Sequence, residues 1–458
     1  MDPLDDTIIA VSTPPGWGGL GLVRLSGAEA LSIARKIFRS GSGETAPIRP
    51  RELVFGEVYD SESGQALDEA FLSYFAAPRS YTRENVVELS CHGSQVVLEE
   101  LVRLGVKAGA RPAGPGEFTL RAYLNGRIDL LQAEAVNDLI AASTLTQAKI
   151  STRQLRGGLS KKMAGFRSAI LEAASLLEAA IEFPDEETGI GPARVEEGLR
   201  SALAAVDALA STYDFGRTLS EGLTLAIVGR ANVGKSTLFN ALLDRDRAIV
   251  SPDPGTTRDY LREKLRVGES VFQLIDMAGL ETSEHPLEKE GIRRGQAIAA
   301  EADGILFILD ASRAESPSDL QLLRQFRGRR SILVFNKSDL PRKIDALACR
   351  KARPGAPWID VSALKKSHVT DLKDLVRETF AGQREDGEEV ILHLRQKLIL
   401  SEISDALKAA LAVLGQGHSE EVCAEEVRRA LNLLGRLTGE VRADEVIDGV
   451  FSRFCVGK

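Results

Sequence analysis

The sequence predicts a multidomain α/β protein with an N-terminal α+β domain and a helical domain that carries an inserted, doubly wound α/β domain. Before residue 120, short alternating apolar runs are separated by Gly and Pro turns. From about 121 to 213, apolar residues recur at helical spacing. Between about 222 and 380, short apolar runs alternate with helical segments. We therefore assign residues 1–120 to the first domain, 121–221 and 381–458 to two parts of the helical domain, and 222–380 to the insertion.

The first domain shows α+β character in runs such as 20–25 and 85–89, where apolar and polar residues alternate. In the helical domain, one apolar stripe comprises Leu155, Leu159, Met163, Phe166, Ile170, Ala174, Leu177 and Ile181. Residues 183–187 interrupt this stripe, and a second one follows through Leu199, Leu203, Val206 and Leu209. After the polar linker 381–389, helical spacing resumes, so the third domain is expected to be inserted between two helices.

The inserted domain opens with a phosphate-binding loop. Residues 229–236 read GRANVGKS, directly after the apolar run 223–228 and before a predicted helix at 237–243. Glycines let the backbone N–H groups point inward, Lys235 supplies a cation for the β- and γ-phosphates, and Ser236 supplies a hydroxyl for Mg²⁺. A Gly-rich turn that carries a lysine by chance is disfavoured, because both flanking elements are present. The predicted nucleotide contacts here are Asn232, Val233, Gly234, Lys235, Ser236 and Thr237.

A second motif predicts the base. Asn336, Lys337, Ser338 and Asp339 follow the apolar run 331–335. The Asp339 carboxylate can accept hydrogen bonds from N1–H and the exocyclic amine of guanine, whereas adenine offers no such pair of donors. Asn336 can connect this loop to the phosphate loop. A further loop after the strand 358–361 can offer the Ala363 N–H to the guanine oxygen, and its residues are Ser362, Ala363 and Leu364. The expected ligand is GTP or GDP.

Two segments are expected to sense the γ-phosphate. Asp276 suits an indirect Mg²⁺ contact, the Gly279 N–H suits a γ-phosphate oxygen, and Thr257 can complete the Mg²⁺ coordination. The predicted GTP contacts in these segments are Ser251, Pro252, Asp253, Pro254, Gly255, Thr256, Thr257, Asp276, Met277, Ala278 and Gly279. An ordinary polar turn at 255–259 is an equally good interpretation of that pattern alone.

The residue after Gly279 is Leu280, which cannot orient water as the glutamine of Ras-like GTPases does. Another group must therefore order the attacking water. Glu288 is the candidate, although its place in a Glu-rich helix start also fits a solvated helix face.

Composition limits the alternatives. The net charge is −8 and the pI is about 5.5, so RNA contact requires a local basic patch or a partner. Residues 324–330 and 342–353 are such patches, and a solvated surface is the simpler interpretation of both. No apolar run is long enough to cross a membrane, no signal peptide is evident, and four cysteines lack a CxxC pair. These features favour a cytoplasmic protein.

Several motifs together resemble the MnmE/TrmE family of bacterial and organellar tRNA-modifying GTPases. They are DTII (6–9), TPPGWGG (13–19), VRLSG (23–27), SYT (80–82), HG (92–93), GPGEF (114–118), AYLN (122–125), DLLQAE (129–134) and FCVGK (454–458). The resemblance runs from end to end of the chain.

The resemblance implies an N-terminal folate-binding domain through which the chain forms a homodimer. It also implies an FAD-dependent MnmG/GidA-type partner in a heterotetramer, which modifies carbon 5 of the wobble uridine, position 34, of certain tRNAs. The (carboxymethyl)aminomethyl product draws on 5,10-methylene- or 5-formyl-tetrahydrofolate. Positions that match the folate contacts are Arg24, Glu88, Arg127 and Lys458.

The resemblance further implies potassium-stimulated hydrolysis, with Glu288 ordering the attacking water. Together with Lys235 of the phosphate loop, Glu288 is thus a predicted catalytic residue. Positions that match the potassium site are Asn232, Ser251, Asp253 and Thr256. Met277 replaces a common threonine, and Glu281 stands where many members carry arginine. Two alternatives stay open at this point: an RNA-binding GTPase switch in ribosome assembly, and a structural switch whose hydrolysis only resets a dimer.

Overall fold

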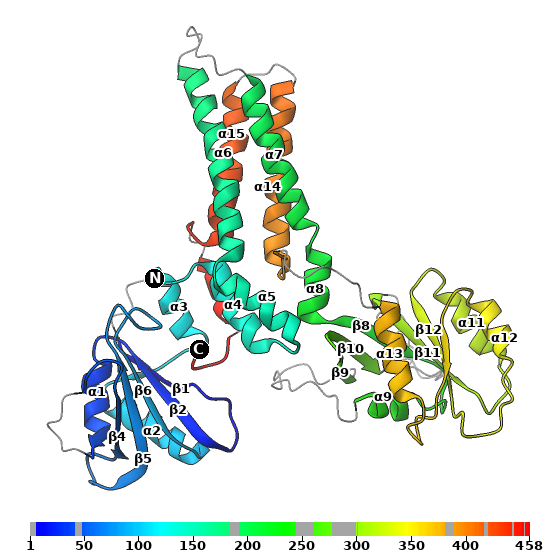
Figure 1. The fold of residues 1–458 in the computed structure, drawn as a ribbon, viewed down its shortest axis with the longest axis horizontal. Coiled ribbons are helices and arrows are strands. Elements are labelled where there is room, and N and C mark those ends of the chain that lie inside the picture. The colour runs from blue at the N-terminus through cyan, green and yellow to red at the C-terminus, as the bar shows by residue number, and fades with distance from the viewer. Residues whose placement is uncertain are drawn as a thin grey trace, which may run out of the picture. The chain divides into compact units, whose positions relative to one another are not determined.

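The computed structural model describes residues 6–41, 48–182, 192–243, 261–276, 299, 301–380, 389–415, 420–441, 444–452 and 454–458. The chain divides into two compact units (Figure 1). Unit 1 comprises Met1–Asn137, Gln154–Ser175 and Ala424–Lys458, and unit 2 comprises Asp138–Arg153 and Leu176–Cys423. The domain boundaries expected from the sequence stay predictions. Within the described part of the chain, no helix combines the length and apolar character needed to span a bilayer.

Unit 1 contains a seven-stranded sheet in the order β3-β4-β5-β6-β2-β1-β7. All its pairings are antiparallel except that of β1 with β7. Alternation in β2 buries Val23 and Leu25 against helices α1 and α2 and turns Arg24 to the opposite face. The strands are β1 (Ile8–Val11), β2 (Gly18–Ser26), β3 (Phe38–Ser40), β4 (Leu53–Tyr59), β5 (Ala66–Phe75), β6 (Val86–Gly93) and β7 (Arg111–Pro112), and the helices are α1 (Ala30–Ile37) and α2 (Gln95–Lys107).

The helical stripe expected from Leu155 onward is not a single helix. Helix α5 ends at Leu155 and α6 begins at Gly158, and Gly157 between them has φ +85. This left-handed conformation favours glycine and interrupts the helix. Within α6, Leu159, Met163 and Ile170 are buried as expected. The further helices that contribute to unit 1 are α3 (Glu117–Leu124), α4 (Leu130–Ala141), α6 (Gly158–Glu182), α15 (Glu420–Thr438) and α16 (Asp444–Phe451).

Unit 2 contains a six-stranded sheet in the order β13-β12-β11-β8-β10-β9, parallel except for the β9–β10 hairpin. One core lies on the face covered by α9 and α13, and another lies on the face covered by α11 and α12. This is the doubly wound arrangement that the sequence predicts. Its elements are β8 (Leu223–Val228), α9 (Lys235–Leu243), β9 (Leu261–Val267), β10 (Ser270–Asp276), β11 (Gly304–Asp310), α11 (Pro317–Gln325), β12 (Ser331–Asn336), α12 (Ala346–Ala352), β13 (Trp358–Asp360) and α13 (Val369–Phe380).

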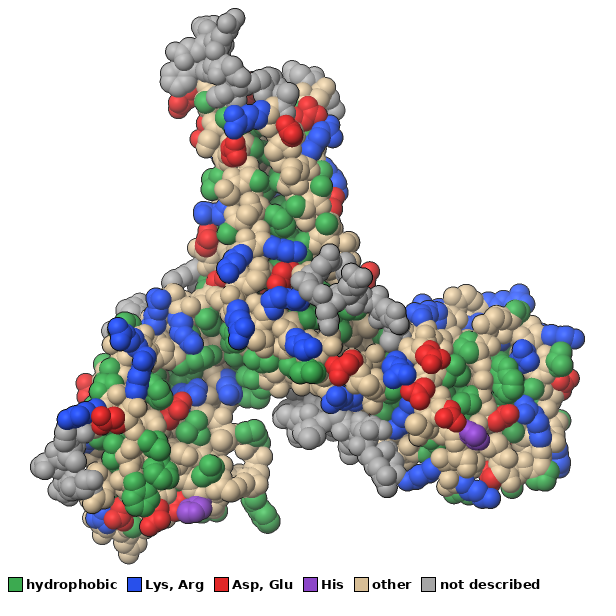
Figure 2. All heavy atoms as spheres, in the orientation of Figure 1, with side chains coloured by type: hydrophobic (Ala, Val, Ile, Leu, Met, Phe, Trp, Pro, Cys, Tyr) green, Lys and Arg blue, Asp and Glu red, His purple; other side chains and the backbone are tan. Residues whose placement is uncertain are grey.

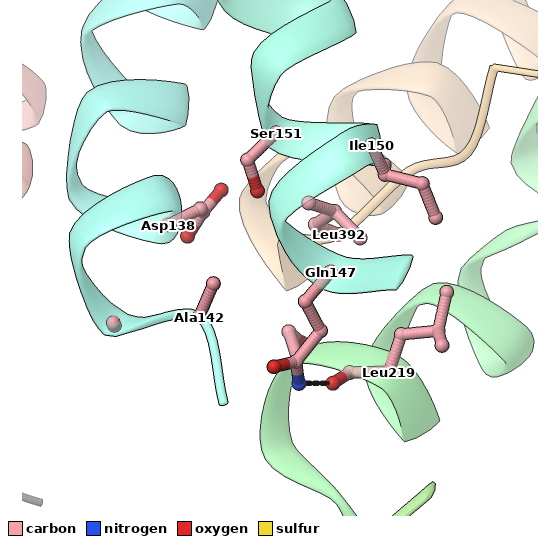
Figure 3. A pocket seen from close by; sticks show the side chains of 9 residues that line it. Asp138, Ala142, Gln147, Ile150, Ser151, Leu219 and Leu392 are labelled. Atoms are coloured by element: carbon pink, nitrogen blue, oxygen red, sulfur yellow. Dashed lines mark hydrogen bonds between the residues drawn. The ribbon is translucent and has the colours of Figure 1, made fainter. Parts of the chain in front are cut away.

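Helices of unit 2 contact this sheet directly. Arg217 on α8 pairs with Asp303 at 2.9 Å, and the Asp303 carboxylate also accepts from the Thr224 N–H at 2.8 Å. Figure 3 shows a small pocket where Gln147 of α5 donates a hydrogen bond to the Leu219 carbonyl of α8. The remaining helices are α5 (Leu145–Leu155), α7 (Pro192–Ala210), α8 (Tyr213–Glu221) and α14 (Leu394–Gly415).

A buried arginine in unit 1 pairs with three carboxylates. The Arg121 side chain is 1% exposed and pairs with Asp6 at 2.6 Å, Glu117 at 3.0 Å and Glu84 at 3.2 Å. Burial raises the pKa of Glu117, but hydrogen bonds from Arg111, Gly114 and Arg121 outweigh it and hold that pKa below its ordinary value. The hydrogen bond from Arg111 lowers the pKa of Asp6 as well. These carboxylates are therefore ionised at neutral pH.

Replacing Arg121 with methionine is expected to destabilise unit 1 by about 1.5–3 kcal/mol, because Glu117 and Glu84 lose charge-assisted hydrogen bonds while Arg111 still pairs with Glu117. The folded-state pKa values of Asp6 and Glu117 lie below their unfolded values of about 4. The stabilisation is thus present above about pH 4 and is lost as the pH falls through the folded-state pKa values.

Hydrogen exchange of the β1 and α3 amides measures this loss of stability. Arg103→Met, which removes an exposed pair with Glu100, is the control and should leave exchange unchanged; equal effects of the two variants would contradict the prediction.

Candidate functional site

The phosphate loop lies between β8 and α9, as the sequence predicts. Gly234 has φ +96, and a Cβ there would lie 2.3 Å from Asn336 Nδ2. At Gly229 a Cβ would lie 2.4 Å from the Ile308 carbonyl oxygen. Both positions therefore require glycine. Lys235 is buried, and its ammonium donates to the carbonyl oxygens of Gly229 and Arg230, each at 2.8 Å. The loop thus holds a cation beside a helix N-terminus, which suits an anionic ligand.

A surface hollow continues from this loop toward the base motifs. Its lining residues are Ser236, Thr237, Asn240, Ala241, Ala363, Leu364 and Lys366. Ser236 and Thr237 belong to the first turn of α9, whereas Ala363 and Leu364 follow β13. The carboxyl ends of β8, β12 and β13 therefore bring together segments more than 100 residues apart, at the edge where doubly wound sheets bind ligands.

Asn336 joins the two predicted nucleotide loops. Its Nδ2 donates to the Val233 carbonyl at 2.8 Å, which is the connection expected from the sequence. Its Oδ1 accepts from the Ala363 N–H at 3.0 Å. The Ala363 N–H therefore bonds to protein in this structure, and its contact with guanine stays a prediction.

Lys337 is held by a residue that the sequence analysis missed. Its ammonium donates to the Asn232 carbonyl and to Asp310 Oδ2, each at 2.7 Å. Burial raises the pKa of Asp310, but hydrogen bonds from Lys337 and Ser312 outweigh it and keep the carboxyl ionised. Asp310 is the last residue of the apolar strand β11. A polar residue at the carboxyl end of such a strand could have been predicted as a site residue.

Asp339 is half-buried beside the Ser362 loop. The Ser362 hydroxyl donates to Asp339 Oδ1 at 2.6 Å, and this bond lowers the pKa of the carboxyl. An ionised carboxylate oriented by one hydroxyl retains acceptor positions for two N–H donors. Ser338, between Lys337 and Asp339, donates its N–H to the Val361 carbonyl at 3.0 Å, which ties the two base loops together.

Asp276 is the last residue of β10, is 4% exposed and lies in the strand beside β8. The other predicted switch residues lie outside the described residues, so their roles stay predictions. They are Ser251, Pro252, Asp253, Pro254, Gly255, Thr256, Thr257, Met277, Ala278, Gly279 and Glu288, together with the departures at Leu280 and Glu281.

The predicted folate residues of unit 1 form a second cluster. Arg24 and Glu88 face each other across β2 and β6 and pair at 2.7 Å. The Arg24 guanidinium lies 5.6 Å from the ring centroids of both Tyr81 and Phe118. Arg127 covers the Tyr81 ring at 4.6 Å and donates to the Tyr81 carbonyl at 2.9 Å. The structure therefore brings three of the four predicted residues together, since Arg24 and Arg127 lie beside Tyr81 and Glu88 pairs with Arg24.

Lys458, the fourth residue, lies against the same cluster through its backbone. Its carbonyl accepts from the Phe118 N–H at 3.2 Å, and the Gly457 carbonyl accepts from the Ser12 hydroxyl at 3.0 Å. Phe454 is buried in this segment. Residues 454–458 are thus docked on unit 1, as their composition suggested. Tyr81 and Phe118 were missed as site residues, although both stand in the quoted motifs.

Comparisons with known proteins match nearly the whole chain. The MnmE helical domain matches residues 130–455, and the N-terminus of the GTP-binding protein TrmE matches residues 7–127. The tRNA modification GTPase MnmE of Syntrophus aciditrophicus is 40% identical over 462 residues, which cover 99% of this chain and all of that protein. The chain belongs to the MnmE family. The MnmE proteins of Koribacter versatilis and Geobacter sulfurreducens, at 41% and 40% identity, also cover 99% of the chain.

Membership of the MnmE family makes the chain a tRNA modification GTPase, an enzyme that hydrolyses GTP. This accounts for the nucleotide site in unit 2. The second cluster lies in the part of unit 1 that matches the TrmE N-terminus.

Proposed function

We propose that the chain hydrolyses GTP in a potassium-stimulated reaction and, with an FAD-dependent MnmG/GidA-type partner, modifies carbon 5 of the wobble uridine of certain tRNAs. The product carries a (carboxymethyl)aminomethyl group, and its one-carbon unit comes from a tetrahydrofolate. The chain would act as a homodimer within a heterotetramer. Because its substrate is tRNA, the proposed activity belongs to the cytoplasm.

In the GTPase half of the proposal, Lys235 neutralises phosphate charge and the Ser236 hydroxyl binds Mg²⁺, with Thr257 as a second ligand. Asn232 has φ 62 and lies at the mouth of the phosphate loop. Its amide oxygen suits potassium, together with Ser251, Asp253 and Thr256. A monovalent cation there would offset the charge that develops on the phosphates. Glu288 would order the attacking water, which Leu280 cannot do.

In the folate half of the proposal, Glu88 can accept paired N–H donors from a pterin ring, as Asp339 can from guanine. Arg24 orients that carboxylate through its 2.7 Å pair. Tyr81 and Phe118 offer aromatic faces beside it. Arg127 and Lys458 supply cations for a carboxylate tail. The residues present therefore fit a tetrahydrofolate, which when bound supplies a one-carbon unit.

The observation that carries the proposal is the presence of both clusters in one chain of the MnmE family. Nucleoside mass spectrometry of total tRNA from cells that lack the protein is the direct test. We expect the position-34 modification to disappear and to return when the gene is restored. Unchanged tRNA would overturn the proposal, and an accumulation of immature ribosomal subunits instead would favour the ribosome-assembly alternative.

Potassium is expected to raise the rate of GTP hydrolysis by the unaltered chain by about tenfold or more relative to sodium, because the bound cation offsets transition-state charge. Asn232→Gly keeps a positive φ accessible and removes the amide oxygen. This variant should show equal rates in the two salts. Phosphate release in matched potassium and sodium chloride measures both, and equal rates for the unaltered chain would exclude the cation role.

Arg24→Met is expected to weaken binding of 5-formyl-tetrahydrofolate by about 10- to 100-fold, because Glu88 loses the charge-assisted hydrogen bond that orients it, and such a bond contributes about 1.5–3 kcal/mol. Calorimetric titration of the full chain measures the affinity. Arg49→Met is the matched control, because Arg49 is exposed and its ion pair among the described residues is with Glu52, at 3.7 Å. GTP hydrolysis should persist in both variants. Equal folate affinity in both would remove Arg24 from the site.

A further inference from the structure

The surface of unit 2 carries a basic groove that is separate from the nucleotide site. It runs between α12 and the start of β13, and its lining includes Leu347, Arg350, Lys351, Pro354 and Trp358. We call it the Trp358 groove. Figure 2 shows Lys and Arg side chains over the part of unit 2 that carries α11 and α12. The groove coincides with the basic segment 342–353 that the sequence singled out.

The local charge is opposite to that of the whole chain. The chain has a net charge of −8, whereas residues 342–358 contain one acidic residue, Asp345, and five basic ones: Arg342, Lys343, Arg350, Lys351 and Arg353. Arg342 pairs with Asp360 at 3.0 Å, and Arg353 is buried. Among the described residues, no carboxylate forms an ion pair with Arg350 or Lys351, and both side chains are exposed. They present a positive surface that an anionic partner can neutralise.

The groove also carries a rigid aromatic face. Trp358 is 42% exposed although it packs edge-on against the buried Phe335 ring at 6.1 Å. The Arg350 guanidinium lies 5.4 Å from the centre of the Trp358 ring. An exposed tryptophan bordered by arginine and lysine is the combination that binds unpaired bases, because the ring stacks on a base while the cations contact phosphates.

The wall of the groove is fixed by Arg353. Its Nε donates to the Ser331 hydroxyl at 2.8 Å, and its other nitrogens donate to the Phe326 and Arg329 carbonyls. These hydrogen bonds hold the turn that precedes β13. Gly355 in that turn has φ +80. The groove is thus a preformed surface, and Arg353 supports it without being available to a ligand.

We propose that the Trp358 groove binds RNA, with one unpaired base stacked on Trp358 and adjacent phosphates on Arg350 and Lys351. The inference deepens the proposed function, because it assigns tRNA a contact surface on the GTPase domain. Trp358 is the first residue of β13, which is only three residues long. The Ser362 loop of the nucleotide site follows the other end of that strand. RNA in the groove would therefore lie at the opposite end of β13 from the base-reading loop.

A protein segment that adds a strand beside β13 is the other occupant to consider. The edge is short, since β13 has three residues and pairs with β12 over three positions. Pro357 precedes it and has no N–H to donate. The unpaired cations also have no use in strand pairing. Charge and the exposed indole therefore favour RNA.

The test is fluorescence anisotropy of the full chain with a labelled, unmodified tRNA transcript over a range of salt concentrations. R350E/K351E is expected to weaken binding by about tenfold or more and to reduce the salt slope by about 2. W358A is expected to weaken it by about tenfold, and W358F is expected to retain most of the affinity. K161E/K162E, two exposed lysines on α6, makes the same change in charge and is the control. GTP hydrolysis should persist in every variant, which shows that the nucleotide domain is folded.

Equal tRNA affinity and salt slope in R350E/K351E and the unaltered chain would overturn the proposal and would leave a protein segment as the occupant of the groove. The same conclusion follows if the two double variants weaken binding equally, because the effect would then be one of general charge. Neither result bears on position-34 nucleosides in cells, so failure of the groove and failure of the proposed function are distinguishable.

Discussion

Replacing Lys235 with alanine is expected to lower the rate of GTP hydrolysis by about 10²–10³-fold, the usual effect of removing one group that stabilises transition-state charge. The ammonium is buried and held by the carbonyl oxygens of Gly229 and Arg230. It is therefore positioned before the nucleotide arrives. The loop should keep its shape without it, since Asn336 still bonds to the Val233 carbonyl. Phosphate release at saturating GTP measures the change.

Lys343→Ala is the matched control for this variant. Lys343 is an exposed lysine on the same domain, and it follows β12 rather than lining the phosphate loop. Its removal should leave turnover unchanged. Calorimetry with GDP and with a non-hydrolysable GTP analogue separates binding from chemistry, and the loss should be larger for the triphosphate. Turnover of Lys235→Ala within twofold of the unaltered chain would contradict the assignment.

Asp339→Asn is expected to reverse the base preference of the nucleotide site. The carboxylate accepts from two guanine donors, whereas the amide offers one acceptor and one donor group, so guanine loses a bond and its amine faces another amine. Affinity for GDP should fall by about 100-fold or more, because polar groups are left unpaired in the complex. Xanthine carries an oxygen where guanine carries the amine, so XDP should bind better than GDP.

Calorimetry with GDP and XDP, for the variant and the unaltered chain, makes this comparison directly. Ser362→Ala is the informative companion, because it removes the hydroxyl that orients Asp339 at 2.6 Å and leaves the carboxylate in place. That variant should bind GDP more weakly without gaining affinity for XDP. An Asp339→Asn chain that still prefers GDP would show that another group reads the base.

The nucleotide site was predictable because its chemistry lies in contiguous residues. The phosphate loop needs glycines, a lysine and a hydroxyl within eight positions, and sequence spacing alone determines their order. The partner of Lys337 was not predictable in this way. Asp310 lies 27 residues upstream and meets Lys337 only because β11 and β12 are neighbours in register. Such a contact depends on strand order, which the sequence pattern does not specify.

The same limit applies to unit 1. Arg24 and Glu88 were selected through the family resemblance, and their pairing depends on the register of β2 against β6. Tyr81 and Phe118 come from a loop and a helix that meet beneath Arg24. The end of α5 at Leu155 was missed because apolar spacing continues across Gly157, whose positive φ interrupts the helix. Apolar periodicity indicates which face of a helix is buried, but it does not locate the residue at which the backbone changes direction.

The first and last residues of the six-stranded domain lie close together, which suits a domain inserted into another one. At its start, Thr224 donates to Asp303, and at its end, the Phe380 ring lies so near Gly304 that a Cβ there would come within 2.2 Å of it. The entry and the exit of the chain thus lie at neighbouring residues, Asp303 and Gly304, where β11 begins. A module with adjacent ends can be accommodated in a connection between two host helices without forcing them apart. By the same reasoning, a short Gly-Ser bridge in place of residues 223–380 should leave the surrounding helices able to pack.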